Sequence, residues 1–179
     1  MSQLASNDPK EARNKRFLGG LFDFPTGIMP IGRLDEKSEG LLLMTTDGKL
    51  SDRINRSGIE KEYYVQLDGE IDDVAIGLME NGVEIGFHGK KYVTKFASVQ
   101  KLDISPTLVA PDPKLRIGRH RPTSWISIVI TEGKNRQVRK MTAAVGYPTL
   151  RLIRVRVGTI TLDNLMPGDV VPLGRSDFQ

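Results

Sequence analysis

The chain of 179 residues is long enough to bury one substantial hydrophobic core or two small ones. It contains no cysteine, which excludes disulfides, thiol nucleophiles and cysteine-ligated zinc, and its two histidines, His88 and His120, form no metal-ligand pattern, so we assign no metal. No apolar run approaches the ~18 residues of a membrane span, and residues 1–10 lack the apolar core of a signal peptide, so we expect a cytoplasmic protein without membrane contacts.

Charge is unevenly distributed along the sequence. The net charge is +4, yet the segment from Asp35 to Glu84 has 13 acidic and 5 basic side chains, whereas the segment from Lys114 to Arg156 has 1 acidic and 11 basic. Lysine and arginine displace condensed counterions from phosphates, so the second segment is suited to a polyanion such as RNA. Charge alone favours a blander alternative, a solvated basic face.

The first part of the chain is expected to hold a leader, a strand and a helix. The first sixteen residues are polar and basic, so we expect a partly flexible leader over residues 1–27. From Ile31 the pattern is a turn followed by the apolar run Leu41 to Met44, which is short enough for a buried strand. Leu50 and Ile54, four residues apart, then predict a short amphipathic helix.

Residues 61–67 alternate between apolar and polar positions and predict a strand with one buried face. The residues on that face are Tyr63, Val65 and Leu67. A helix should follow, with Asp72 or Asp73 as its N-cap and Asn81-Gly82 at its end. Its expected buried stripe consists of Val74, Leu78 and Met79.

The middle of the chain alternates between β-rich and irregular segments. Residues 91–104 predict one long strand or a hairpin, and residues 105–122, which contain four prolines, predict an irregular basic loop that could separate two lobes. Residues 125–130 predict another strand.

The last part of the chain predicts a helix and a strand. Residues 136–145 should form a helix that buries Val138, Met141 and Val145 and ends at Gly146. Residues 151–157 should form a strand with a basic face that carries Arg154 and Arg156. Strands outnumber helices, and most connections are too short for repeated parallel crossovers, so the sequence predicts an α+β fold.

Asp35 is the first candidate for chemistry. It stands in the glycine-flanked segment GRLDEKSEG, residues 32–40, directly before the apolar run. Reactive groups are usually presented on loops beside a rigid scaffold. Taken alone, an aspartate in such a turn is more often a cap, and we expect the neighbouring Glu36 and Glu39 to be solvated.

The segment EGKNRQVRK, residues 132–140, is a strand-to-helix junction rich in hydrogen-bond donors. Backbone N–H groups at a helix N-terminus, with lysine and arginine beside them, can bind phosphates. The segment lacks the spacing of a nucleotide-hydrolysing P-loop, and a basic helix face explains it equally well. Adjacent helix positions differ by ~100°, so Val138 and Arg139 can present an apolar and a cationic group to different sides of a site.

Tyr63 and Tyr64 lie on opposite faces of their predicted strand, so at most one of them can point to a given pocket. A tyrosine can stack on an extruded base. A strand tyrosine is more often part of the core, and the local pattern favours that interpretation.

Three segments taken together resemble the signature segments of a known family, in the same order and spacing. They are GRLDEKSEGLLLMTTDG (32–48), KEYYV (61–65) and EGKNRQVRKM (132–141). The family is the RsuA/RluB/E/F family of bacterial rRNA pseudouridine synthases, and residues 122–165 look most like a large-subunit branch of it. The resemblance extends from about Ile28 to Leu173, and such an extended match is far more specific than one short motif.

The resemblance implies roles for individual residues. Asp35 aligns with the catalytic aspartate of the family, Arg139 with the basic residue paired to that aspartate, and Tyr63 with the tyrosine that packs on the target base. Val138 aligns with an apolar wall of the site. The further expected substrate contacts are Arg33 and Lys61. The expected contacts to the RNA backbone are Lys134, Arg136, Arg154, Arg156 and the loop from Arg116 to Arg121.

The resemblance also implies a fold. It is a bent, mainly antiparallel mixed sheet with flanking helices, which forms two subdomains around a basic cleft. We expect a catalytic domain at residues 28–173 and a tail at 174–179. The N-terminal S4 RNA-binding domain of many relatives is not expected here, and their first strand, which ends in Lys-Pro, has no clear match before Phe24.

The implied function is isomerisation of a uridine to pseudouridine in large-subunit ribosomal RNA, without a cofactor, by a monomer. One alternative is a non-catalytic rRNA-binding or ribosome-assembly protein that uses the same basic segment. A weaker alternative is a base-removing glycosidase.

Overall fold

The structure, a computed structural model, describes residues 3–5, 8, 10, 13, 17–103, 105–118 and 121–174. Much of the expected leader lies outside these ranges, as do Arg119, His120 and the expected tail from residue 175. The described elements are η1 (Leu18–Gly20), β1 (Met29–Pro30), β2 (Glu39–Gly40), β3 (Met44–Thr45), α2 (Gly48–Arg56), β4 (Lys61–Asp68), α3 (Asp73–Asn81), β5 (Glu84–Phe87), β6 (Lys90–Val93), β7 (Ser98–Leu102), β8 (Thr123–Ile130), α4 (Gln137–Ala144), β9 (Thr149–Val157) and β10 (Ile160–Thr161). Within the described part of the chain, no helix is long and apolar enough to cross a lipid bilayer.

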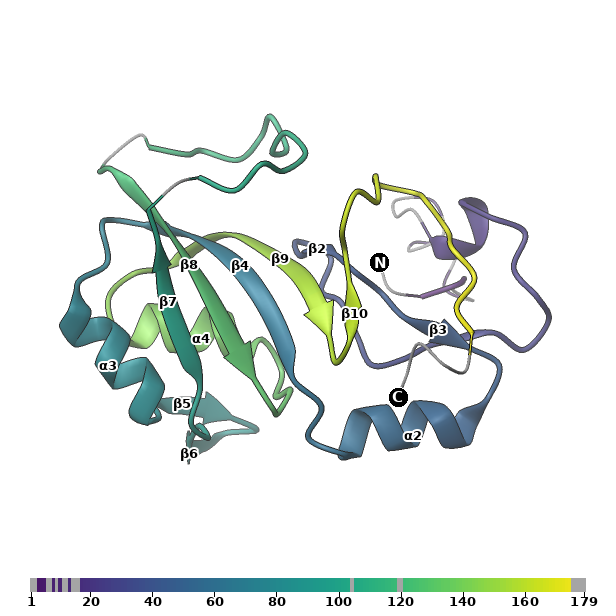
Figure 1. Cartoon of the computed structure of the whole chain (residues 1–179), viewed down its shortest axis with the longest axis horizontal. Helices are drawn as coiled ribbons and strands as arrows, with labels where there is room; N and C mark the ends of the chain where they lie inside the picture. Colours follow the sequence, from purple (N-terminus) through teal and green to yellow (C-terminus); the bar gives the residue numbers. More distant parts are fainter. Residues whose placement is uncertain are drawn as a thin grey trace.

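A six-stranded sheet forms the centre of the fold (Figure 1). Its strand order is β10-β9-β4-β8-β7, and the short β2 pairs with β9. The β2–β9 pair is parallel, and the other pairs of this sheet are antiparallel. The strand pairs β1–β3 and β5–β6 form two smaller sheets. A mixed, mainly antiparallel sheet with helices packed on it confirms the predicted α+β class.

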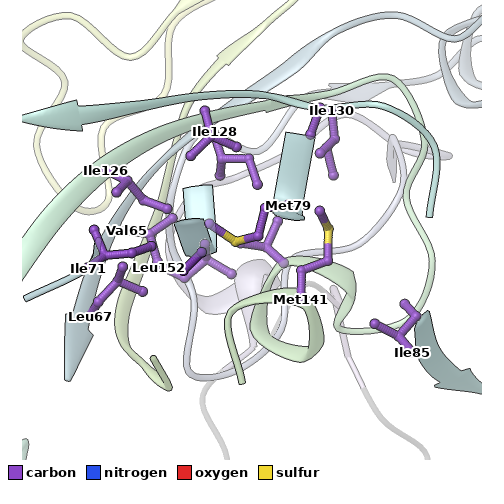
Figure 2. Close-up of a cluster of buried hydrophobic side chains, with 14 residues drawn as sticks. Val65, Leu67, Ile71, Met79, Ile85, Ile126, Ile128, Ile130, Met141 and Leu152 are labelled. Carbon is purple, nitrogen blue, oxygen red and sulfur yellow. The ribbon is translucent and has the colours of Figure 1, made fainter. Parts of the chain in front are cut away.

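The larger hydrophobic core lies between this sheet and helices α3 and α4 (Figure 2). The sheet contributes alternate positions of its strands, among them Val65, Leu67, Ile126, Ile128, Ile130 and Leu152. Val65 and Leu67 confirm the face predicted for the strand at 61–67, and Val138 and Met141 confirm the inner face predicted for α4. Burial of an apolar side chain of this size contributes about 1.5–3 kcal/mol, so this core supplies most of what fixes α3 and α4.

The stripe predicted for α3 is wrong in two of its three positions. Val74 and Leu78 are 73% and 55% exposed, whereas Ala75 and Met79 are buried. Ala75 and Met79 are four residues apart and therefore share a face, so the helix is turned by about 100° from the expected orientation. Its predicted ends are confirmed, because Asp72 accepts a hydrogen bond from the backbone N–H of Ala75 and Gly82 follows the last turn with φ +99°.

A second, smaller core lies under the segment that contains the apolar run. It consists of Ile31, Leu41, Leu43, Ile54 and Val157. The predicted strand at 41–44 is replaced by two short strands, β2 before the run and β3 at its end. Leu41 and Leu43 are buried as expected. The run, however, pairs with two different partners: the N–H of Leu41 donates to the carbonyl of Arg154 in β9, and the carbonyl of Leu43 accepts from the N–H of Ile31, the residue after β1. Two separate cores agree with the expected two-part architecture.

The β-rich segment at 91–104 belongs to two sheets rather than to one long strand. β6 forms a hairpin with β5, and β7 pairs with β8 in the central sheet. Residues 105–118 and 121–122, the described part of the irregular loop predicted at 105–122, contain no helix or strand, which confirms that prediction. We call residues 105–118 the β7–β8 loop. In Figure 1 it extends from the ends of the two strands as a long excursion.

A β-bulge in β9 decides where its arginines point. Tyr63 of β4 pairs with Arg154, and the preceding residue Glu62 pairs with Arg156, so Val155 has no partner on β4. Adjacent residues of a strand face opposite sides of the sheet, so the extra residue separates the two arginines. The predicted basic face with both Arg154 and Arg156 is therefore wrong.

Candidate active site

Asp35 lies on a loop between β1 and β2, and we call residues 33–41 the Asp35 loop. The N–H of Ser38 donates a 2.8 Å hydrogen bond to the backbone carbonyl of Asp35, which closes a tight turn. Because the backbone carbonyl accepts this bond, the turn does not use the carboxylate. The Asp35 side chain is 26% exposed, and its Oδ2 lies 3.8 Å from Nη1 of Arg136. The carboxylate therefore combines partial burial with a cationic neighbour.

Arg136 reaches Asp35 from the N-terminus of α4. It is the N-cap residue of that helix and has φ +53°, a left-handed conformation that is uncommon for residues other than glycine. Such backbone strain is concentrated at functional sites. The N-terminus of a helix also carries partial positive charge, so its field and the guanidinium act on the carboxylate with the same sign.

Arg139 lies half-buried on the next part of α4 and binds the Asp35 loop through its backbone. Nη2 donates a 2.6 Å hydrogen bond to the carbonyl of Lys37, and Nη1 donates to the carbonyl of Thr149 at 3.4 Å. Burial lowers the pKa of Arg139, and Arg136 lowers it further, while Asp35 and Glu39 oppose this shift. Asp35 is thus within electrostatic reach of Arg139. Among the described residues, however, it is Arg136 that forms the ion pair with Asp35, rather than the expected Arg139.

Arg154 holds the two ends of the Asp35 loop. Its Nε donates a 2.7 Å hydrogen bond to the carbonyl of Leu41, and its Nη1 donates to the carbonyl of Arg33 at 3.4 Å. The residue is 4% exposed, so its guanidinium has no surface to offer to a phosphate. The expected RNA-backbone contact by Arg154 does not fit this position, because burial behind the loop makes it a structural anchor of the loop.

Arg156, on the other face of the sheet, is engaged by two carboxylates. Its Nε donates to Glu62 at 2.9 Å and its Nη1 donates to Glu60 at 3.1 Å. These hydrogen bonds raise the pKa of Arg156, and the bond that it donates to Glu62 has the largest effect. A phosphate at this arginine would have to compete with both acids, so the expected contact is not supported by the geometry.

The two expected substrate contacts on β4 lie close to Arg154. Tyr63 pairs with Arg154 in the sheet, and it packs half-buried against the larger core, to which Val138 also belongs. Burial lowers the pKa of Lys61, and the charge of Arg154 lowers it further. The Nζ of Lys61 donates to the carbonyl of Ile59 at 2.9 Å. The strand therefore brings a ring and a partly desolvated amine towards the base of the Asp35 loop.

Two further expected contacts, Arg33 and Lys134, differ in exposure. The side chain of Arg33 is exposed at the start of the Asp35 loop. Lys134 is half-buried, with its Nζ 5.2 Å from the ring centroid of Phe87 and 5.0 Å from that of Tyr92. These cation–π contacts hold Lys134 beside the β5–β6 hairpin.

Comparison with known proteins identifies the family of the chain. The family described as RNA pseudouridylate synthase matches residues 3–144. The chain belongs to this family. The match includes the Asp35 loop, β4 and the whole of α4, which carry the candidate residues Asp35, Tyr63 and Arg139.

Relatives of this pseudouridine synthase are found at substantial identity. The "Ribosomal large subunit pseudouridine synthase E" of Xanthomonas campestris pv. campestris is 43% identical over 149 residues, which cover 82% of this chain and 78% of that protein. The protein of the same name from Vibrio parahaemolyticus serotype O3:K6 is 43% identical over 143 residues, covering 79% and 58%. The chain thus spans a little over half of the Vibrio relative.

A solved structure shares the fold of the synthase. A structure described as "Crystal structure of pseudouridylate synthase" aligns with a TM-score of 0.73 and 29% identity, covering 90% of this chain and 64% of that one. "Human RNA Pseudouridylate Synthase Domain Containing 1" aligns with a TM-score of 0.50 at 15% identity, which concerns the fold alone. These likenesses confirm the fold that the sequence resemblance implied.

Two parts of the site were missed by sequence reasoning. Glu39, expected to be solvated, forms a bidentate ion pair with the buried Arg151. Glu132 accepts hydrogen bonds from the hydroxyl of Tyr92, the backbone N–H of Lys95 and the amide of Gln137. Glu132 is the single acidic residue in the basic segment from Lys114 to Arg156, and this isolation in the sequence could have marked it as a candidate. No local signal identified Arg151, because its partners are distant in the sequence.

A cavity of about 1380 Å³ borders the Asp35 loop at Leu34, Ser38 and Glu39. Most of its lining is apolar and comes from segments 18–28 and 159–173. This lining differs from the basic cleft expected for RNA, which stays a prediction.

Proposed function

We propose that this synthase isomerises a uridine to pseudouridine in ribosomal RNA of the large subunit, and that Asp35 is its catalytic carboxylate. The observation that carries the proposal is the placement of Asp35. Its carboxylate is partly buried, lies beside Arg136 at the start of α4, and sits on a loop that two arginines hold at three backbone carbonyls. The names of the large-subunit relatives supply the choice of RNA.

The chemistry requires a carboxylate at the ribose. The N1–C1′ bond breaks, the uracil turns, C5 joins C1′, and the proton lost from C5 is balanced by one gained at N1. The bonding changes are internal to one nucleotide, so neither a cofactor nor a second substrate is required. A carboxylate can stabilise positive charge that develops at C1′, or act as a nucleophile or base. In each case it must be aimed at the sugar, which is what a fixed loop provides.

The target uridine has to leave its stack before it can react. Extrusion of a base costs a few kcal/mol, which stacking on an aromatic ring and contacts to the backbone can offset. We assign the stacking to Tyr63 and the apolar wall to Val138. Arg33, Lys61 and Arg139 are assigned to the substrate side of the site.

Contacts to RNA phosphates are assigned to basic side chains that are at least partly accessible to solvent. These are Arg136 and Lys134 near α4, together with Lys114 and Arg116 of the exposed β7–β8 loop. Arg154 and Arg156 are left out, because one is buried and the other is engaged by two acids. Phosphate contacts release counterions, so binding should weaken steeply with salt.

We further propose that residues 28–173 act as one catalytic unit, as a monomer in the cytoplasm. In support, the residues assigned to the target uridine all lie on the Asp35 loop, β4 and α4 of a single chain, and Arg154 of β9 anchors the Asp35 loop. Light scattering of the purified protein, alone and with RNA, tests the monomer, and a molar mass of twice the chain's 19.9 kDa for the protein alone would contradict it.

The decisive experiment is to incubate large-subunit rRNA with the protein and to map pseudouridine chemically. The wild type should form it at a defined position, and Asp35→Asn should form none while it keeps its RNA affinity, because the amide is nearly isosteric but uncharged. Glu36→Gln, which changes the exposed neighbouring carboxylate, is the matched control and should stay active. RNA binding without pseudouridine in the wild type would instead support the non-catalytic alternative, and release of free uracil would support a glycosidase.

A further inference from the structure

Arg151 of β9 connects three segments that are far apart in the sequence. Its Nε and Nη2 donate to the two carboxylate oxygens of Glu39, at 3.0 and 2.7 Å. Its Nη2 also donates to the carbonyl of Val109, at 2.9 Å. The guanidinium carbon lies 5.9 Å from the ring centroid of Trp125. One side chain thus contacts the Asp35 loop, the β7–β8 loop and the central sheet.

Burial makes these contacts strong constraints. Arg151 is 5% exposed, so its charge is largely removed from water and depends on its partners. A bidentate guanidinium–carboxylate pair fixes both distance and orientation, which a lysine ammonium does not do. Glu39, at 40% side-chain exposure, is the more accessible member of the pair.

The two loops are held against a rigid support. Gln66 of β4 pairs with Trp125 of β8 on one side and with Arg151 of β9 on the other, so these three residues form a row across the middle of the sheet. β4 and β8 pair without a break over eight residues, so the support is firm on that side of the row, whereas the β4–β9 pairing has a register shift directly beside it, between Gln66 and Leu67. The loops on either side of Arg151 are the parts that can move.

We propose that Arg151 is a positioning residue that couples the β7–β8 loop to the Asp35 loop. Glu39 is four residues after Asp35, so the ion pair limits how far the carboxylate can drift. Val109 belongs to the loop that carries the exposed cations Lys114 and Arg116. Contact of RNA with that loop and placement of Asp35 are therefore linked through one guanidinium. This inference rests on the proposed function in two respects, the catalytic role of Asp35 and the contact of RNA with the β7–β8 loop.

The test uses three variants of the full chain. Glu39→Gln removes the charge of the more accessible member of the ion pair. Arg151→Lys keeps the positive charge but removes the planar guanidinium that forms two hydrogen bonds to Glu39. Glu60→Gln is the matched control, because Glu60 also binds an arginine of β9, Arg156, but on the far side of the bulge. Should Arg151→Lys fail to fold, Glu39→Gln carries the test.

Two readouts do not depend on activity. Trypsin can cut the β7–β8 loop after Lys114 and Arg116, and cutting reports how often the loop opens. Loss of charged hydrogen bonds should raise the rate roughly tenfold in Glu39→Gln and Arg151→Lys, and leave Glu60→Gln unchanged. Trp125 is the only tryptophan in the sequence, so its emission reports the guanidinium beside it and should shift in the same two variants.

A third readout separates positioning from binding. In Glu39→Gln, kcat for pseudouridine formation should fall about 100-fold while KM for RNA stays within about twofold, because a misplaced carboxylate affects the chemical step. An unchanged cutting rate, or an unchanged kcat, in folded Glu39→Gln would overturn the coupling. If the wild type forms no pseudouridine, the proposed function fails, whereas cutting and emission still decide whether the two loops are linked.

Discussion

Arg154 donates its Nε hydrogen to the carbonyl of Leu41 at 2.7 Å, and this bond joins the middle of β9 to the far end of the Asp35 loop. The same guanidinium reaches the carbonyl of Arg33 at the near end. Asp35 lies between these two points. The buried arginine therefore fixes the span of the loop, and the turn from Asp35 to Ser38 fixes its curvature.

Arg154→Lys should impair turnover without abolishing RNA binding. A lysine can replace one of the two hydrogen bonds but not both, because its ammonium lacks the planar fork. A loop displaced by about 1 Å can cost on the order of 100-fold in rate. Single-turnover rates and RNA affinity should be measured beside Arg56→Lys, which alters an exposed ion pair of α2. Equal single-turnover rates in both variants would show that Arg154 does not position the Asp35 loop for catalysis.

Arg136 and Arg139 should be separable by mutation. Arg136 is exposed and pairs with the Asp35 carboxylate, so Arg136→Gln should lower kcat with little change in Tm. Arg139 is half-buried and binds the carbonyl of Lys37, so Arg139→Gln should lower both kcat and Tm. Thermal unfolding with parallel kinetics checks this. A large loss of Tm in Arg136→Gln alone would show that Arg136, and not Arg139, has the structural role.

Gly40→Ala should unfold the region around β2. Gly40 has φ +94°, and a Cβ at this position would lie 2.3 Å from the carbonyl oxygen of Arg154 and 2.8 Å from its nitrogen. The contact is with backbone atoms of the central sheet, so the parallel β2–β9 pair would have to separate. We expect a loss of about 3 kcal/mol or more in unfolding free energy. Gly48→Ala, where a Cβ meets nothing within 4 Å, should be neutral or slightly stabilising in denaturant unfolding.

Glu132 should make stability depend on acid. Burial alone would raise its pKa, but hydrogen bonds from Tyr92, Lys95 and Gln137 outweigh burial and lower the pKa below its ordinary value of 4.5. A carboxylate whose pKa is lowered by folding stabilises the fold above its unfolded pKa and loses that contribution as the pH falls through its folded pKa. Glu132→Gln should therefore cost about 1–3 kcal/mol at pH 7 and less at pH 3. Urea unfolding at the two pH values measures the difference. A deficit that is equal at both would show that the charge of Glu132 contributes nothing.

The salt dependence of RNA binding should identify which cations face phosphates. Arg116→Gln and Lys134→Gln should each reduce the slope of log K against log salt by about 1. Arg156→Gln should leave the slope unchanged, because Glu60 and Glu62 already neutralise that arginine. Titrations over a range of salt concentrations provide the slopes. A reduced salt-dependence slope in Arg156→Gln would show that Arg156 does contact RNA phosphates.

Local pattern was enough to predict the strand at 61–67, the inner face of α4 and the caps of α3, because each depends on residues that are near in sequence. Prediction from local pattern failed where a contact with a residue distant in the sequence determines the structure. The orientation of α3 is set by the sheet it covers, so Ala75 rather than Val74 is buried. The pairing of Glu39 with Arg151 joins residues 112 positions apart. The ion pair of Asp35 with Arg136 depends on the left-handed turn before α4, which a basic segment does not reveal.

Val155, which a register shift leaves without a partner on β4, has a consequence for insertions and deletions in this chain. Its removal would let β9 pair regularly with β4 from Lys61 to Gln66, and one end of the strand would then rotate by half a turn. Either Arg154 would leave the loop it anchors for solvent, or Arg156 would be forced towards the interior. Deletion of this one residue would thus move one of the two arginines to the opposite face of the sheet. A point substitution of Val155 should be tolerated far better than its deletion.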